Sequence, residues 1–198
     1  MNELYPIFVR LRNRRTLVVG GGGMATVRVK QLLAAGAAVT VIAPEVSDEI
    51  ERLASEGSLQ LIKRKFERSD VDQSFFVVIG ATNNGSVQQA LAEEAESRGL
   101  LYNVVDRPEH CNFYTPAVVE RGDLKIAICT QGQSPVFSGR LRQELEEALP
   151  ASAGEFTALL GELREKLKLK IPWSENRRQA VSGLAEAGLV GRGSLRQT

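Results

Sequence analysis

The sequence predicts an α/β fold in which a parallel sheet carries helices on both faces. Three observations predict it. Apolar, β-prone runs alternate with helical runs between residues 16 and 105, the order expected of βαβ units. Four consecutive glycines separate the first strand from the first helix. After residue 106 the alternation gives way to a predicted hairpin and further helices. We therefore expect a Rossmann-like, doubly wound sheet, followed by a small hairpin-and-helix segment and a helical C-terminal domain.

The predicted strands are short and apolar. The run from Phe75 to Ile79 is continuous, as expected for a strand that is buried on both faces of a parallel sheet. The segment that begins at Leu59 instead alternates apolar and polar residues. The five parallel strands are expected at 16–19, 39–42, 59–62, 75–79 and 101–105.

Capping residues predict where the helices begin and end. The first helix is expected over 24–35, where a glycine follows it. Ser47 is placed to cap the second helix, whose first turn holds two acids that favour that end of the helix dipole. Ser86 and Gln89 have capping-box spacing, which predicts the start of a third helix that ends near Gly99.

The second half of the chain is organised differently. Residues 117–130 predict two strands joined by an Arg-Gly-Asp turn. Ser134-Pro135 predicts a helix start, because serine caps helices and proline fits the first helical position. This helix is expected to run to Leu149, and further helices are expected over 153–170 and 174–190. The expected domains are 1–115, 116–150 and 151–198.

The composition excludes several classes of protein. The 198 residues hold 25 Lys and Arg against 24 Asp and Glu, whereas general nucleic-acid binders carry a clear basic excess. The two cysteines, Cys111 and Cys129, make no disulfide framework and are expected as reduced thiols. No apolar run approaches the ~18 residues of a membrane span, and no signal-peptide pattern opens the chain. We expect a cytoplasmic protein that binds neither nucleic acid nor a membrane.

The glycine-rich segment fits the dinucleotide-binding pattern. Gly20, Gly22 and Ala25 occupy the three small positions of G-x-G-x-x-G/A, directly after a strand and before a helix. The first glycine makes the turn, the second admits the pyrophosphate, and the third small residue lets helix and strand pack closely. The pyrophosphate then lies at the helix N-terminus. A purely structural glycine turn is the alternative interpretation.

The end of the second strand bears on the choice of nucleotide. An acid that binds the adenosine ribose is usual there, but this chain has Ala43, so the acid is missing or displaced to Glu45. No Lys or Arg lies in 43–50 to bind a 2′-phosphate, which favours NAD over NADP. The P-loop pattern and the Tyr-x-x-x-Lys pair of short-chain dehydrogenases are both absent.

Asp106 follows the last predicted parallel strand. Ligands of open α/β sheets bind beyond the carboxyl ends of the strands, so this carboxylate is placed where chemistry is expected. It is a candidate general base that takes a proton from the substrate. The alternative is a turn cap before Pro108.

Two other polar segments are less specific. His110 and Cys111 are adjacent, but two neighbouring residues seldom make a metal site alone, and no permanent zinc site is expected. The segment from Thr130 to Ser134 joins a strand to a helix, and it is explained equally well as an anion-binding nest or as a capping turn.

The motifs together resemble the precorrin-2 dehydrogenase/sirohydrochlorin ferrochelatase family of sirohaem biosynthesis. The resemblance covers roughly residues 1–150, and each motif alone is modest while their order and spacing are specific. The matching motifs are Tyr5-Pro-Ile-Phe8, Leu17-Val-Val-Gly-Gly-Gly22, Met24-Ala25, Val41-Ile-Ala-Pro44, Gly80-Ala-Thr82-Asn83, Asn103-Val-Val-Asp106, Asn112-Phe113, Pro116-Ala117 and Gly132-Gln-Ser-Pro135.

The resemblance implies NAD-dependent oxidation of precorrin-2 to sirohydrochlorin, with Asp106 as the catalytic residue. It implies that 116–150 is a dimerisation segment of a homodimer. Some family members also insert Fe²⁺. The implied cofactor-binding residues are Gly20, Gly22, Gly23, Met24, Ala25, Pro44, Glu45 and Thr82, and no metal-binding residue is implied. The substrate-binding candidates are Arg107, Thr130, Ser134 and Arg140.

The chain departs from the family pattern at two positions. Gly23 replaces an acid of some relatives, and Thr130 replaces a serine. Because precorrin-2 carries eight carboxylates, arginines are expected near the cleft, and the candidates are Arg28, Arg107, Arg140 and Arg142. The alternative function is a non-catalytic NAD-sensing regulatory domain, which needs the glycine loop but not Asp106.

Overall fold

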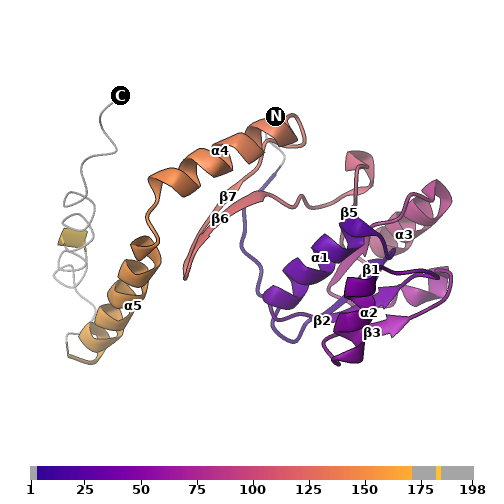
Figure 1. The fold of residues 1–198 in the computed structure, drawn as a ribbon, viewed down its shortest axis with the longest axis horizontal. Coiled ribbons are helices and arrows are strands. Elements are labelled where there is room, and N and C mark those ends of the chain that lie inside the picture. Colours follow the sequence, from indigo (N-terminus) through magenta and orange to yellow (C-terminus); the bar gives the residue numbers. More distant parts are fainter. Residues whose placement is uncertain (1–3, 171–181, 184–198) are drawn as a thin grey trace. The chain divides into compact units, whose positions relative to one another are not determined.

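The computed structural model describes residues 4–170 and 182–183 (Figure 1). The chain divides into two compact units, with the boundary between Tyr114 and Thr115. The first unit holds the glycine loop and Asp106, and the second holds the hairpin and the later helices. The separate dimerisation segment and helical domain expected within the second unit stay predictions.

The first unit is built on a five-stranded parallel sheet with the order β3-β2-β1-β4-β5. This order confirms the Rossmann-like, doubly wound fold. The strands are β1 (Arg15–Val19), β2 (Ala38–Ile42), β3 (Gln60–Ile62), β4 (Val77–Gly80) and β5 (Leu101–Val104). The chain reverses its direction of progress across the sheet between β1 and β4, and ligands of such sheets bind at the carboxyl ends of the strands on either side of that point.

Helices cover both faces of this sheet, and a hydrophobic core lies on each face. The apolar side chains of β1 point alternately into these two cores. Val18 packs with buried residues of α1 (Gly23–Ala34) and α2 (Asp48–Ser55). Leu17 and Val19 pack on the other face with buried residues of α3 (Gly85–Ser97). All three β1 side chains are buried, which explains why the strand is apolar throughout rather than alternating.

The caps of α2 and α3 show one success and one error of sequence reasoning. Ser47 caps α2 as expected, and its hydroxyl accepts from the backbone nitrogen of Ile50. The capping box predicted for Ser86 is wrong. Asn84 caps α3, and its Oδ1 accepts from the backbone nitrogens of Ser86 and Val87 at 3.1 and 3.2 Å. The asparagine comes first in the chain, so Ser86 already lies inside the first turn.

Two short 3₁₀ helices lie in the loops of the first unit. The first, η1 (Arg68–Asp70), lies between β3 and β4, and β4 begins at Val77 rather than at the expected Phe75. The second, η2 (Pro108–His110), follows β5.

The second unit begins with the predicted antiparallel hairpin of β6 (Ala117–Arg121) and β7 (Leu124–Ile128). Two helices follow, α4 (Pro135–Ala148) and α5 (Ser152–Lys170). Ser134 caps α4 as expected, and its hydroxyl accepts from the backbone nitrogen of Phe137 at 3.2 Å.

Arg121 ties the hairpin to the end of α4. Its guanidinium donates to the carbonyl oxygens of Glu146 and Leu149 at 2.6 and 3.0 Å, where the last carbonyls of a helix lack partners. The start of α5 lies close to the same residue, because a Cβ added at Gly154 would lie 2.4 Å from the carbonyl oxygen of Arg121. The hairpin and both helices are therefore packed together.

The helix predicted over 174–190 lies largely outside the described residues. Among the helices that are described, none has the length and apolar character needed to cross a membrane.

Candidate active site

Two glycines of the loop are required by the packing of the chain itself. Gly20 has φ +123°, and a Cβ there would lie 2.1 Å from the carbonyl oxygen of Ala81. A Cβ at Gly21 would lie 2.1 Å from the carbonyl oxygen of Glu45. The carbonyl of Gly21 also accepts from the backbone nitrogen of Ser47 at 2.8 Å. These contacts place the loop against the segments that follow β4 and β2.

The next two glycines border open space instead. A Cβ built at Gly22 or Gly23 meets no atom within 4 Å. Gly22 is the N-cap of α1, so no side chain caps this helix, and its first turn holds no acid. The helices α2, α3 and α4 all have a polar cap. The free N–H groups of α1 therefore fit a bound anion such as the pyrophosphate of a dinucleotide.

Close packing behind the loop explains the third small residue of the motif. Ala25 is fully buried in the core between α1 and the sheet. The next residue joins the loop to α2, because the Thr26 and Ser47 hydroxyl oxygens lie 2.8 Å apart. The first turn of α1 is thus fixed relative to both the sheet and the start of α2.

A cavity of about 230 Å³ lies beside this loop. It brings together four of the predicted site residues, Met24, Thr82, Asp106 and Arg107. The remaining lining residues are Ala81, Asn83, Gln88 and Val105. The lining residues together come from the start of α1, the segment after β4, the start of α3 and the turn after β5, at the switch point of the sheet.

Asp106 lies in a tight turn with a left-handed backbone, φ +61°. The backbone nitrogen of Val105 donates to the carbonyl of Gly80 at 2.9 Å, and that of Arg107 donates to the carbonyl of Val104 at 3.2 Å. The Asp106 carboxylate is thus carried on a turn that begins at the carboxyl ends of β4 and β5. An aspartate tolerates this conformation better than most residues do.

The segment that follows this turn folds back along β5. Asn112 accepts from the backbone nitrogen of Tyr102 at 2.8 Å and donates to the carbonyl of Leu100 at 2.7 Å. The side-chain nitrogen of Asn103 donates to the carbonyl of Phe113 at 3.0 Å. Sequence reasoning gave no role to Asn112, although its position in a matched motif was a signal. It acts here as a partner for the edge strand β5, which leads into the turn that carries Asp106.

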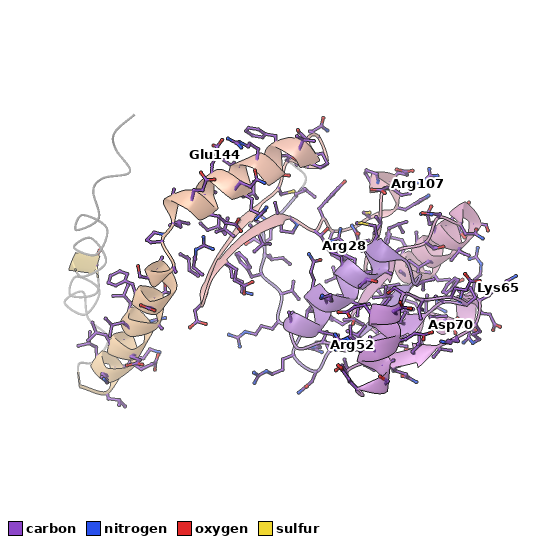
Figure 2. All side chains as sticks on the ribbon, in the orientation of Figure 1. Arg28, Arg52, Lys65, Asp70, Arg107 and Glu144 are labelled. Atoms are coloured by element: carbon purple, nitrogen blue, oxygen red, sulfur yellow. The ribbon has the colours of Figure 1, made fainter. Side chains whose placement is uncertain are left out.

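Arg28 is a second charged group, and the charge of Asp106 acts on it. It lies on α1 (Figure 2), and its Nη1 donates to Oε1 of Gln31 at 3.0 Å. In the sequence it comes four residues, about one helical turn, after Met24. Burial lowers the pKa of Arg28, and the Asp106 carboxylate opposes that change. The Arg28 Nε is buried without a hydrogen-bond partner among the described residues.

The other predicted site residues lie elsewhere. Pro44 and Glu45 are exposed and follow β2, beside the glycine loop. Three substrate-binding candidates belong to the second unit, where each has a local partner. The Thr130 hydroxyl accepts from the nitrogen of Ser134 at 3.2 Å, a contact that belongs to the capping-turn interpretation and does not test the anion nest. Arg140 pairs with Glu144 at 3.1 Å. Their roles toward substrate stay predictions.

No metal site is formed by the part of the chain that the structure describes. No group of three or more His, Cys, Asp or Glu side chains is suitably placed there. His110 ends η2, whereas the Cys111 thiol is turned to the backbone of β5, 3.3 Å from the nitrogen of Val104. The side chains of His110 and Cys111 therefore lie in different environments, although the residues are adjacent.

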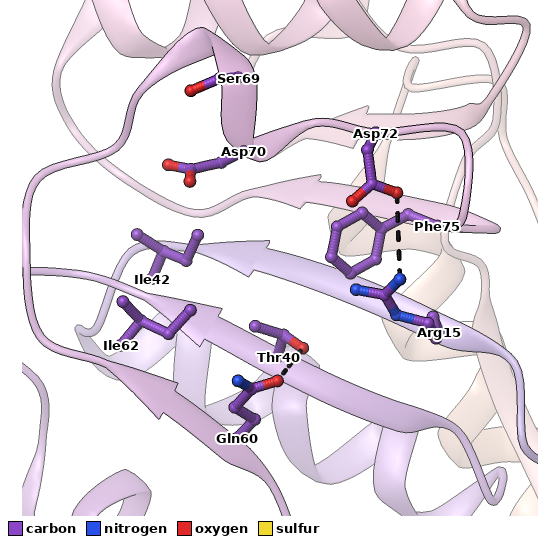
Figure 3. Close-up of a pocket in the computed structure, with 9 residues that line it drawn as sticks. All are labelled: Arg15, Thr40, Ile42, Gln60, Ile62, Ser69, Asp70, Asp72 and Phe75. Carbon is purple, nitrogen blue, oxygen red and sulfur yellow. Dashed lines mark hydrogen bonds and ion pairs between the residues drawn. The ribbon is translucent and has the colours of Figure 1, made fainter.

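A second cavity, of about 200 Å³, lies on the sheet face over β2 and β3 (Figure 3). Several of its polar groups already have partners. Thr40 donates to Oε1 of Gln60 at 3.4 Å, and Arg15 lies 4.0 Å from Asp72. It shares no lining residue with the cavity beside Asp106. It contains none of the predicted site residues, so the cavity beside Asp106 is the candidate active site.

Comparisons with known proteins agree with this geometry. The NAD_binding_7 family model, described as "Putative NAD(P)-binding", matches residues 7–117. The model "Sirohaem biosynthesis protein central" matches 121–148. A solved structure titled "SirC, precorrin-2 dehydrogenase" superposes with a TM-score of 0.75 and 32% identity, covering 91% of this chain and 89% of that one. This chain belongs to the precorrin-2 dehydrogenase family of sirohaem biosynthesis. The resemblance drawn from the motifs is therefore confirmed.

Longer members of the family are similar over nearly the whole chain. The siroheme synthase of Methylobacillus flagellatus is 36% identical over an alignment of 213 positions, which covers 98% of this chain and 45% of the relative. Siroheme synthase 1 of Yersinia enterocolitica is 39% identical over 199 residues, 98% of this chain and 42% of the relative. The chain thus spans less than half the length of these curated relatives.

Proposed function

We propose that this chain catalyses the NAD-dependent oxidation of precorrin-2 to sirohydrochlorin. The observation that carries the proposal is the cavity in which the uncapped start of α1 and the Asp106 carboxylate meet. The structural likeness to a precorrin-2 dehydrogenase over 91% of the chain supports it.

The glycine loop is the proposed binding site for the dinucleotide. The backbone N–H groups at the start of α1 would hold the pyrophosphate, because Gly22 and Gly23 leave room for it. Met24 and Thr82, which line the cavity, would contact the nicotinamide half. When bound, NAD supplies the acceptor for the hydride that leaves the substrate. Pro44 and Glu45 lie at the end of β2, where the adenosine ribose would be bound.

Asp106 is the proposed general base. Oxidation of the macrocycle removes a hydride and a proton, and the proton needs an acceptor at the cavity wall. Asp106 is the carboxylate among the residues that line this cavity. The turn holds Asp106 beside the start of α1, where NAD would bind. The substrate would therefore lose its proton to Asp106 and its hydride to NAD at neighbouring positions. Arg107, also in the lining, is proposed to contact the substrate.

Two extensions of the function follow the family. Insertion of Fe²⁺ into sirohydrochlorin, with iron as a substrate, is a second activity to test, because the longer relatives are named siroheme synthases.

We also propose a homodimer and a cytoplasmic location. The homodimer is supported by the exposed apolar side chains of the second unit, such as Val136 and Phe137.

The alternative, a non-catalytic NAD-sensing domain, is not favoured by the comparisons. It needs the glycine loop but explains neither the match to the sirohaem central model nor a carboxylate in the cavity.

The direct test is incubation of the purified chain with precorrin-2 and NAD, followed by absorbance, with and without Fe²⁺ or Co²⁺. We expect NADH and sirohydrochlorin to form together without metal. NAD binding with no oxidation of precorrin-2 would favour the sensing alternative. Formation of a metal complex faster than in a protein-free control would add chelation to the activity.

A further inference from the structure

The four arginines expected near the substrate differ in whether they already have a carboxylate partner. Three of them pair with a glutamate close by in the sequence: Arg107 with Glu109, Arg140 with Glu144 and Arg142 with Glu146. Arg28 forms no ion pair with any of the described residues, and its one hydrogen bond goes to the neutral side chain of Gln31. Its guanidinium therefore keeps most of its five donors available.

Burial makes this lack of a partner costly. The Arg28 side chain is half-buried, and its Nε has neither an acceptor in the described chain nor exposure to solvent. A buried donor without a partner is unusual in a native protein and calls for an explanation. Burial also lowers the pKa of Arg28, yet an arginine stays cationic at neutral pH. An anion that arrives with a ligand would satisfy both the charge and the donor.

Arg28 does not itself line the active-site cavity, but it lies one helical turn from a residue that does. It lies four residues after Met24, and residues at this spacing share one face of a helix. Met24 and Asp106 both line the cavity, and the charge of Asp106 acts on Arg28. Long side chains of a helix lean toward its N-terminus, which here is the end at the cavity.

We propose that Arg28 binds a carboxylate of the tetrapyrrole substrate and so fixes the macrocycle against Asp106. This inference rests on the proposed function. A guanidinium can bind a carboxylate through two parallel hydrogen bonds, which fixes orientation as well as position. The pyrophosphate of the nucleotide is the less suitable anion, because the free backbone N–H groups of α1 already provide its site. Arg28 is thus a substrate-positioning residue, one helical turn beyond the nucleotide loop.

The test compares Arg28→Gln and Arg28→Lys with a matched control on the same helix. Lys30→Gln removes one positive charge from α1, but Lys30 is exposed and already pairs with Glu49 at 3.2 Å. Sirohydrochlorin is titrated into each protein without nucleotide, and NAD is titrated separately. We expect Arg28→Gln to weaken sirohydrochlorin binding about 10- to 100-fold, Arg28→Lys to recover part of the loss, and Lys30→Gln to match the wild type.

Retained NAD affinity shows that each variant is folded. In steady state, the KM of Arg28→Gln for precorrin-2 should rise more than its kcat falls. Unchanged sirohydrochlorin affinity in Arg28→Gln would overturn the inference. If NAD affinity falls instead, Arg28 serves the nucleotide. If only the pH–rate profile shifts, Arg28 acts on Asp106 rather than on the substrate. If the wild type itself neither binds sirohydrochlorin nor oxidises precorrin-2, the proposed function fails and this inference fails with it.

Discussion

The Cys111 sulfur accepts a hydrogen bond from the backbone nitrogen of Val104 at 3.3 Å and lies 3.1 Å from the carbonyl oxygen of Arg107. The thiol therefore connects the end of β5 to the residue after Asp106 and closes the turn that carries the candidate base. The Asn103 side-chain nitrogen and the carbonyl oxygen of Val104 each lie 3.3 Å from this sulfur as well. A soft, weakly polar group is well suited to contact donors and acceptors together.

This environment predicts a large difference in reactivity between the two thiols. Burial raises the pKa of Cys111 above its ordinary value, so its reactive thiolate form is scarce until the pH rises well beyond about 8.5. Cys129 is exposed. Iodoacetamide at neutral pH should modify Cys129 first, as followed by mass spectrometry of digested peptides. Because the folded state favours the protonated Cys111, stability should also decline as pH rises above the thiol's unfolded pKa.

Cys129→Ser provides the control, since it should leave almost no rapid labelling in the folded protein. Rapid modification of Cys111 in that variant at neutral pH would contradict the closed turn.

The glycine loop predicts two different outcomes for similar substitutions. Gly22→Val places its side chain in open space, so the protein should fold, with a Tm lowered only by the poorer N-cap of α1, but lose most of its affinity for NAD. Gly20→Val combines φ +123° with a Cβ 2.1 Å from the Ala81 carbonyl, and should lose at least about 1–3 kcal/mol of stability. Thermal unfolding and NAD titration separate the two effects. Normal NAD binding by Gly22→Val would remove the loop from the cofactor site.

NAD should bind more tightly than NADP, by a modest factor. Glu45 is exposed beside the loop, and no Lys or Arg lies in 43–50 to bind a 2′-phosphate. Removing the acid with Glu45→Ala should narrow the difference. Titration of the wild type and this variant with both nucleotides measures it, and equal affinities in the wild type would argue against the expected specificity.

The second unit predicts a homodimer. Val136 is 85% exposed and Phe137 is 59% exposed, both at the start of α4, and apolar surface of this kind marks interfaces. Light scattering at micromolar concentration should return twice the 21.6 kDa chain mass. Phe137→Asp should shift the mass toward the monomer, whereas Glu144→Ala on the same helix should not. A monomer in the wild type at all these concentrations is the contrary result.

The sequence predicted the sheet and its helices because those features depend on local patterns. Runs such as Leu17–Val19 are apolar because both faces of the strand are buried. An apolar run of this kind can be recognised in the sequence without the structure. The glycine loop and Asp106 were predictable for a related reason, since each stands at a fixed place relative to a strand end. The cap of α3 was missed because Asn84 and Ser86 are both good caps, and only the length of the turn after β4 decides between them.

The rest of the site depends on contacts between distant segments. Gly21 is small because the Glu45 carbonyl approaches it, and Arg28 is distinctive only because the turn after β5 lies near α1. Neither contact leaves a pattern in the neighbouring residues. The same holds for Cys111, whose role depends on a chain reversal after η2.

The central claim is that Asp106 takes the proton when the substrate is oxidised at the α1 loop. Asp106→Asn keeps the shape of the side chain but removes its basicity. The decisive measurement is the rate of NADH formation from precorrin-2 by the wild type and by Asp106→Asn, at saturating NAD. We expect the rate to fall about 10²- to 10⁴-fold with NAD affinity little changed, since the loop is untouched. A folded Asp106→Asn protein with near-normal turnover would contradict it and leave Asp106 as a residue of the turn.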